Sequence, residues 1–129
     1  MKAYDLSNLS ILIIDDSRYM RSLLSTVCRG LGIRQVREAR DGETAMNIMQ
    51  RITPDIVTCD WGNEPMNGLE FVHRLRNDQG SPNPFMPVIM ISAHTEMNRV
   101  LKTQQAGINE FLAKPVSATQ IYKHIKSLI

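Results

Sequence analysis

The sequence predicts an α/β domain with a doubly wound, five-stranded parallel sheet that helices cover on both faces. Five short apolar runs alternate along the chain with amphipathic segments, which is the pattern of repeated strand and helix units. Three of these runs are nearly continuous in apolar residues, as expected for strands buried on both faces. With 129 residues, 43% of them hydrophobic, the chain can bury one core, so we expect a single domain over residues 1–129.

The strands are expected at residues 10–15, 35–39, 55–59, 87–91 and 110–113. The first, third and fourth are the continuously apolar runs, so they should be central in the sheet. The run at 35–39 alternates between apolar and polar residues, which indicates an edge strand. The stretch from 77 to 87 is polar and rich in proline, and we expect it to form a loop before the fourth strand.

Helices are expected around residues 20–31, 45–49, 69–75, 95–106 and 121–128, where apolar residues recur at helical spacing. Gly30 and Gly32 are stop signals for the first helix, and Ser117 with Gln120 forms a capping box before the last. The helix at 95–106 has a narrow apolar face. It should therefore bury little and be the most mobile of the five.

Composition and charge exclude several other classes of protein. No stretch reaches the ~18 apolar residues of a membrane span and no signal peptide is present, so we expect a cytoplasmic protein. The net charge is +2, and the Lys and Arg residues form no stripe of the kind that nucleic-acid binders carry. Cys28 and Cys59 lie in apolar surroundings, so we expect two small buried side chains rather than a disulfide or metal pair.

Four of the apolar runs end in residues that can bind phosphate or metal. Asp15 and Asp16 end the first run, Asp60 follows the third, Ser92 the fourth and Lys114 the fifth. Taken singly, each has an ordinary structural explanation as a helix cap, a turn former or a solvated charge. In a parallel sheet, however, all carboxyl ends lie at one edge, where open α/β sheets bind their ligands. We therefore expect the five side chains to converge.

The combined chemistry of these residues is that of phosphoryl transfer. Three neighbouring carboxylates repel one another, and Mg²⁺, which prefers hard oxygen ligands, relieves that repulsion. The ionised carboxylate of Asp60 can attack phosphorus and form an acyl phosphate. Lys114 would neutralise charge on the moving phosphoryl group, and Ser92 would donate a hydrogen bond to one of its oxygens.

At these residues the sequence resembles the response regulator receiver domains, of which the bacterial chemotaxis response regulator is the single-domain type. The resemblance runs from residue 10 to 129. Its motifs are IIDDS at 13–17, EARDGETA at 38–45, PDIVTCDW at 54–61, MNGLEF at 66–71, PVIMISAH at 87–94 and AGINEFLAKP at 106–115. The resemblance implies a flavodoxin-like fold of five βα units with strand order 2-1-3-4-5.

The resemblance also implies a role for each acidic residue of the site. Asp60 would be the phosphorylated aspartate. Asp16 and Asp60 would bind Mg²⁺ directly, and Asp15 would lie close by, often acting through water. The backbone carbonyl of Gly62 would be a further ligand.

Further roles implied by the resemblance concern signalling. Ser92 and Lys114 match the switch hydroxyl and the phosphate-binding lysine of the family. Phe111 matches the aromatic residue that turns inward when the hydroxyl is drawn to the phosphoryl group. The bond between Lys114 and Pro115 matches a cis peptide bond of the family.

Three positions depart from the family pattern. Gly62 replaces a polar side chain that influences the lifetime of the phosphoryl group, and Glu64 replaces a common proline, which stands one residue later as Pro65. We interpret Glu64 as a solvated loop charge. We interpret His94 as an exposed loop histidine, with contact to the phosphoryl group or attacking water as the alternative.

The predicted function is that of a phosphoacceptor domain rather than an enzyme with an external substrate. A sensor histidine kinase or a histidine phosphotransfer protein would donate the phosphoryl group, and a protein target would bind the face formed by the fourth helix, fifth strand and fifth helix. The domain would be a monomer or a phosphorylation-dependent dimer, without direct contact to nucleic acid or membrane. The end of the chain at the last helix favours a freestanding regulator over a receiver fragment of a larger transcription factor.

Two other classes are less compatible with the sequence. Phosphatases of the haloacid dehalogenase type also form an aspartyl phosphate, but they carry an Asp-x-Asp arrangement after the first strand, where this chain has adjacent Asp15 and Asp16. Flavodoxins need a phosphate loop rich in Ser, Thr and Gly at that position. An acidic pair there would repel the flavin phosphate.

Overall fold

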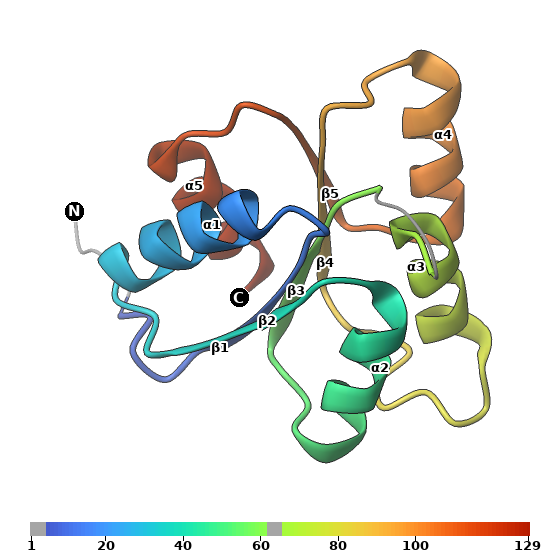
Figure 1. The fold of residues 1–129 in the computed structure, drawn as a ribbon, viewed down its shortest axis with the longest axis horizontal. Coiled ribbons are helices and arrows are strands. Elements are labelled where there is room, and N and C mark those ends of the chain that lie inside the picture. The colour runs from blue at the N-terminus through green and yellow to red at the C-terminus, as the bar shows by residue number, and fades with distance from the viewer. Residues whose placement is uncertain (1–4, 62–65) are drawn as a thin grey trace.

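The computed structural model describes residues 5–61 and 66–129, in which five strands alternate with five helices (Figure 1). The strands are β1 (Ser10–Ile14), β2 (Gln35–Ala39), β3 (Ile56–Cys59), β4 (Val88–Ser92) and β5 (Glu110–Ala113). The helices are α1 (Arg18–Gly30), α2 (Gly42–Arg51), α3 (Gly68–Asn77), α4 (Met97–Ala106) and α5 (Ala118–Leu128). All strand pairs are parallel, and the strand order is β2-β1-β3-β4-β5, which confirms the predicted doubly wound fold.

Alternate side chains of the central strands point into two separate cores. In β1, Ile11 and Ile13 belong to the core beneath α1 and α5, whereas Leu12 and Ile14 belong to the core beneath α2 and α3. Figure 1 shows α1 and α5 on one side of the sheet and α2, α3 and α4 on the other. Every residue of β1, β3 and β4 is buried, which explains why these strands have almost no polar residues.

The expected elements agree with the structure to within a few residues. The strand expected at 87–91 spans Val88–Ser92 instead, so that Ser92 is the last residue of β4 rather than the first residue after it. Cys28 and Cys59 are buried free thiols, as predicted. Within residues 5–61 and 66–129, no helix combines the length and apolar character that crossing a bilayer requires.

Four of the five helices begin with a side chain that caps them. Ser17, Asp41, Asn67 and Ser117 each accept a hydrogen bond from the backbone N–H three residues later, and the capping box at Ser117 is present as predicted. Helix α4 differs, because the side chain of its N-cap residue makes no such hydrogen bond and Thr103 is its one buried residue. This observation confirms that α4 buries little of its surface.

Candidate phosphoacceptor site

The carboxyl edge of the sheet is held by backbone hydrogen bonds that continue one residue past the strands. The N–H of Asp15 donates to the last carbonyl of β2, and the N–H of Asp60 donates to the last carbonyl of β1, each at 3.0 Å. The N–H of Lys114 donates in the same way to the last carbonyl of β4, at 2.9 Å. These three residues are thus fixed at one edge by the parallel register itself.

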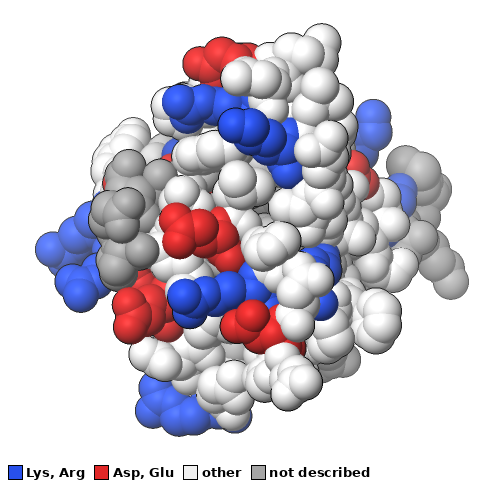
Figure 2. Space-filling view, turned by 90° about the vertical axis from the view of Figure 1, so that its right-hand side faces the viewer, with Lys and Arg blue, Asp and Glu red and all other residues white. Residues whose placement is uncertain are grey.

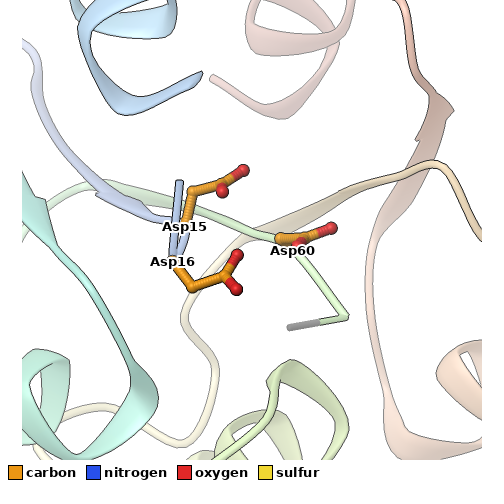
Figure 3. A group of neighbouring side chains, drawn as sticks. All are labelled: Asp15, Asp16 and Asp60. Carbon is orange, nitrogen blue, oxygen red and sulfur yellow. The ribbon is translucent and has the colours of Figure 1, made fainter. Parts of the chain in front are cut away.

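The structure brings the three predicted carboxylates together. Asp15, Asp16 and Asp60 each offer a carboxylate oxygen, and the three oxygens lie within 4.8 Å of one another. Figure 3 shows Asp15 and Asp16 reaching from the end of β1 toward Asp60 at the end of β3. Asp15 is buried, Asp60 is partly buried and Asp16 is exposed. An all-oxygen cluster of this size, open to solvent on one side, fits a hydrated divalent cation such as Mg²⁺.

Lys114 completes the cluster from the end of β5. Its ammonium group donates a hydrogen bond of 2.9 Å to Oδ2 of Asp15 and lies 3.4 Å from Oδ1 of Asp60. The other oxygen of Asp15, Oδ1, accepts a hydrogen bond of 2.9 Å from the N–H of Ser17, just before α1. The buried carboxylate of Asp15 therefore has a partner for each oxygen, as a buried charge requires.

Burial and the crowding of carboxylates both disfavour a negative charge on Asp60, and the ammonium of Lys114 opposes them. Burial raises the pKa of Asp60 above its usual value of 3.8; the ammonium of Lys114 counteracts this rise, and the carboxylates of Asp15 and Asp16 add to it. Burial alone would lower the pKa of Lys114, but the hydrogen bond to Asp15 and the charge of Asp60 outweigh it, so the pKa lies above its usual value. The metal-free site therefore holds more negative charge than it readily accommodates.

Among the remaining predicted residues, Ser92 ends β4, whereas Phe111 lies within β5. Ser92 is fully buried, and its hydroxyl oxygen accepts a hydrogen bond of 3.0 Å from the N–H of His94. Phe111 is half-buried and packs against the core beneath α2 and α3. His94 is exposed, as predicted, and the peptide bond between Lys114 and Pro115 is cis, also as predicted. The expected contributions of Gly62, Glu64 and Pro65 lie outside the residues that the structure describes.

Gly68 allows α3 to pack closely against Asp60, a role that the sequence did not reveal. It begins α3, and its N–H donates a hydrogen bond of 2.5 Å to the carbonyl of Trp61. A Cβ atom at Gly68 would lie 2.9 Å from the carbonyl carbon of Asp60 and 2.9 Å from Sγ of Cys59, and still closer to the carbonyl oxygen of Asp60. Only a residue without a side chain lets α3 approach Asp60 this closely.

Comparison with known proteins identifies the family of the chain. The response regulator receiver domain model matches residues 11–126. The chain is a response regulator receiver domain. This receiver is 30% identical to the chemotaxis protein CheY-3 of Vibrio cholerae over 128 residues, which cover 99% of this chain and 97% of that protein. It is 29% identical to the chemotaxis protein CheY of Pseudomonas aeruginosa over 120 residues, which cover 93% and 95% of the two chains.

Solved structures support the same assignment. The receiver matches CheY4 of Vibrio cholerae with a TM-score of 0.85 and 26% identity, over 94% of this chain and 98% of that one. A response regulator described as putative, from Chloroflexus aurantiacus, matches with a TM-score of 0.85 and 28% identity, over 93% and 96% of the chains. Family membership places the receiver in two-component signal transduction.

Replacing Gly68 with Ala should destabilise the receiver, because the added methyl group overlaps the backbone of Asp60. We expect the free energy of unfolding to fall by about 1–3 kcal/mol, as for other overpacked sites. Gly30→Ala is the matched control, because a Cβ there meets no atom within 4 Å and alanine favours helix. Urea unfolding of both variants measures the difference. Equal stability of the two variants would contradict the close packing of α3 against Asp60.

Replacing Asp60 with Asn should raise the melting temperature of the metal-free receiver by a few degrees, because it removes a charge whose pKa is raised by burial and crowding. When the pKa of a carboxylate is higher in the folded than in the unfolded state, its charge lowers the free energy of unfolding at pH values above the folded-state pKa. This loss of stability disappears as the pH falls to the pKa of the unfolded state. The advantage of Asp60→Asn should therefore be largest at neutral pH and shrink as pH approaches about 4. Melting curves between pH 4 and 8 test this, and an advantage that does not change with pH would contradict it.

Proposed function

We propose that the receiver accepts a phosphoryl group on Asp60 from a phosphohistidine of a sensor histidine kinase or a phosphotransfer protein. The observation that supports this most directly is the placement of Asp60 among two further carboxylates and a lysine. Oxygens of Asp15, Asp16 and Asp60 lie within 4.8 Å, and the ammonium of Lys114 lies 3.4 Å from Asp60. This arrangement provides a nucleophile, a metal-ligand set and a cation at one point on the sheet edge.

In the proposed reaction, a carboxylate oxygen of Asp60 forms a bond to phosphorus as the bond from phosphorus to the histidine nitrogen of the donor breaks. The nitrogen keeps the electron pair of that bond, and the donor leaves as a neutral imidazole when its other ring nitrogen carries a proton. Lys114 stands where its ammonium can neutralise an oxygen of the transferred group, since it already lies between Asp15 and Asp60. Hydrolysis by water would later release phosphate and restore the carboxylate.

Asp16 and Asp60 would hold Mg²⁺ directly, with Asp15 close by. Both oxygens of Asp15 already accept hydrogen bonds, from Ser17 and from Lys114, which suits Asp15 to act through a bound water. The ion supplies positive charge where the carboxylates and the phosphoryl oxygens would otherwise repel one another. The proposed fourth ligand, the carbonyl of Gly62, lies outside the described residues.

The proposed output is a change in the face formed by α4, β5 and α5. Two apolar side chains of α4 are available to a protein target, because Met97 is 75% exposed and Leu101 is 46% exposed. The hydroxyl of Ser92 would turn to the phosphoryl group, and Phe111 would move inward behind it. Figure 2 shows acidic and basic side chains interspersed on the face that carries α3 and α4, which is unlike a nucleic-acid surface.

We propose that the receiver is a phosphoacceptor rather than a phosphatase that acts on external substrates. Its cytoplasmic location stays a prediction. A turnover assay on small phosphate esters distinguishes the two activities, since an acceptor would be labelled once without sustained release. A receiver that forms part of a longer transcription factor would use the same chemistry. The reading frame beyond Ile129 decides between that case and a freestanding regulator.

With Mg²⁺ and acetyl phosphate, the receiver should gain the mass of one phosphoryl group, and Asp60→Asn should gain none. Intact mass spectrometry at short incubation times measures the label. Circular dichroism of the variant serves as the control, because an amide of the same shape should leave the fold in place. A variant labelled to the same extent as the parent would remove Asp60 from this role.

Asp16→Ala should weaken Mg²⁺ binding more than Asp15→Ala, because Asp15 has both of its oxygens engaged by the protein. Asp15→Ala should instead cost more stability, since it leaves Lys114 without its 2.9 Å partner. Titration of Trp61 fluorescence with Mg²⁺ gives the affinities, and urea unfolding without metal gives the stabilities. At ten times the dissociation constant, Mg²⁺ should stabilise the parent by about 1.4 kcal/mol. Equal losses of affinity in the two variants would contradict the division of roles.

A further inference from the structure

Helix α4 is anchored differently at its two ends. At its carboxyl end, the carbonyl of Gly107 accepts hydrogen bonds from Nε and Nη2 of Arg76 at 3.1 and 2.8 Å, which fix this end to α3. At its amino end, the N-cap residue Glu96 makes no side-chain capping bond, unlike the N-cap residues of the other four helices that the structure describes. The first turn of α4 is thus the weakly held end.

Arg99 lies in this first turn, where a cation is disfavoured by the helix dipole. Its Nε is 3.9 Å from a carboxylate oxygen of Glu96, at the limit of an ion pair, and both side chains are substantially exposed. Exposed pairs of this kind contribute little stability. Helix stability therefore does not account for an arginine at this position.

Trp61 provides the contact that does account for it. The guanidinium carbon of Arg99 lies 5.2 Å from the centroid of the Trp61 ring, within the range of a cation–π interaction. Trp61 follows Asp60 directly in the chain, and its carbonyl accepts the hydrogen bond from Gly68 that begins α3. The backbone of Trp61 is thus fixed beside the site while its ring contacts α4.

We propose that Arg99 is a positioning residue that couples the first turn of α4 to the state of Asp60 through Trp61. The inference rests on the proposed function, because it assigns the contact by which a group bound at Asp60 reaches the output helix. A group that shifts the backbone at Asp60 moves Trp61 and alters its contact with Arg99. The uncapped first turn of α4 then responds, and the end fixed by Arg76 does not. Such coupling is reciprocal, so losing the contact also changes how the helix affects the site.

The experiment compares the parent with Arg99→Gln, Arg99→Lys and Lys102→Gln. Arg99→Lys keeps a cation for the ring. Lys102→Gln removes one exposed positive charge from the same helix, away from the Arg99 contact with Trp61, and is the matched control. Trp61 is the single tryptophan of the chain, so its emission reports the contact without background. Hydrogen exchange at Val100, whose N–H donates to the carbonyl of Glu96 at 3.0 Å, reports opening of the first turn.

Without ligand, Val100 should exchange about two- to fivefold faster in Arg99→Gln than in the parent, the factor expected for an exposed cation–π contact. Arg99→Lys should restore most of the protection, and Lys102→Gln should match the parent. With Mg²⁺ and beryllofluoride, a mimic of the acyl phosphate, the parent should change both Trp61 emission and Val100 exchange. In Arg99→Gln the emission should still change, but the exchange at Val100 should no longer respond.

The possible failures are distinguishable. A parent that takes no phosphoryl label and shows no response to beryllofluoride overturns the proposed function, and the coupling with it. If the parent is labelled and Val100 responds equally in Arg99→Gln, the coupling alone is overturned. Equal effects of Arg99→Gln and Lys102→Gln would also overturn it, because the effect would then be one of helix charge and not of the contact with Trp61.

Discussion

The parallel hydrogen-bond register at the carboxyl edge is the constraint on which the site depends. Asp15, Asp60 and Lys114 each stand one residue past a strand, and each donates its backbone N–H to the final carbonyl of the neighbouring strand. A slip of one residue in any pairing would turn that side chain to the other face of the sheet. Alternate residues of β1 pack into two separate cores, so a slip of this strand would also misplace core side chains.

This geometry concentrates negative charge, and the rest of the site balances it. Lys114 offsets part of the charge by pairing with Asp15 and Asp60, and a divalent ion would offset more. Under the proposed function, the same carboxylates that destabilise the fold would serve phosphoryl transfer. Two contacts hold the neighbouring helices in place. Gly68 packs α3 closely against Asp60, and the hydrogen bonds from Arg76 to the carbonyl of Gly107 fix the end of α4 to α3.

The positions of the strands and of the charged residues at their ends could be predicted from the sequence because both depend on local pattern, whereas the strand order came from the resemblance to receiver domains. Asp60 directly follows an apolar run, so its place at the strand end could be predicted without knowledge of its neighbours. Gly68 and Arg99 could not be assigned in this way. Their roles arise only where α3 and α4 approach the chain near Asp60, and no periodicity in the sequence encodes that approach. A glycine at a helix start and an arginine in an exposed helix each have many ordinary explanations.

The ion pair between Lys114 and Asp15 joins residues 99 positions apart. During synthesis, the carboxylate of Asp15, which follows β1, lacks its ion pair with Lys114 until β5 has left the ribosome and joined the sheet edge. An incomplete chain, or a proteolytic fragment that lacks β5, would carry Asp60 without the lysine that balances it. The charge balance of the cluster is therefore tied to completion of the fold, because a chain without β5 would keep the mutually repelling carboxylates and lose the cation that offsets them.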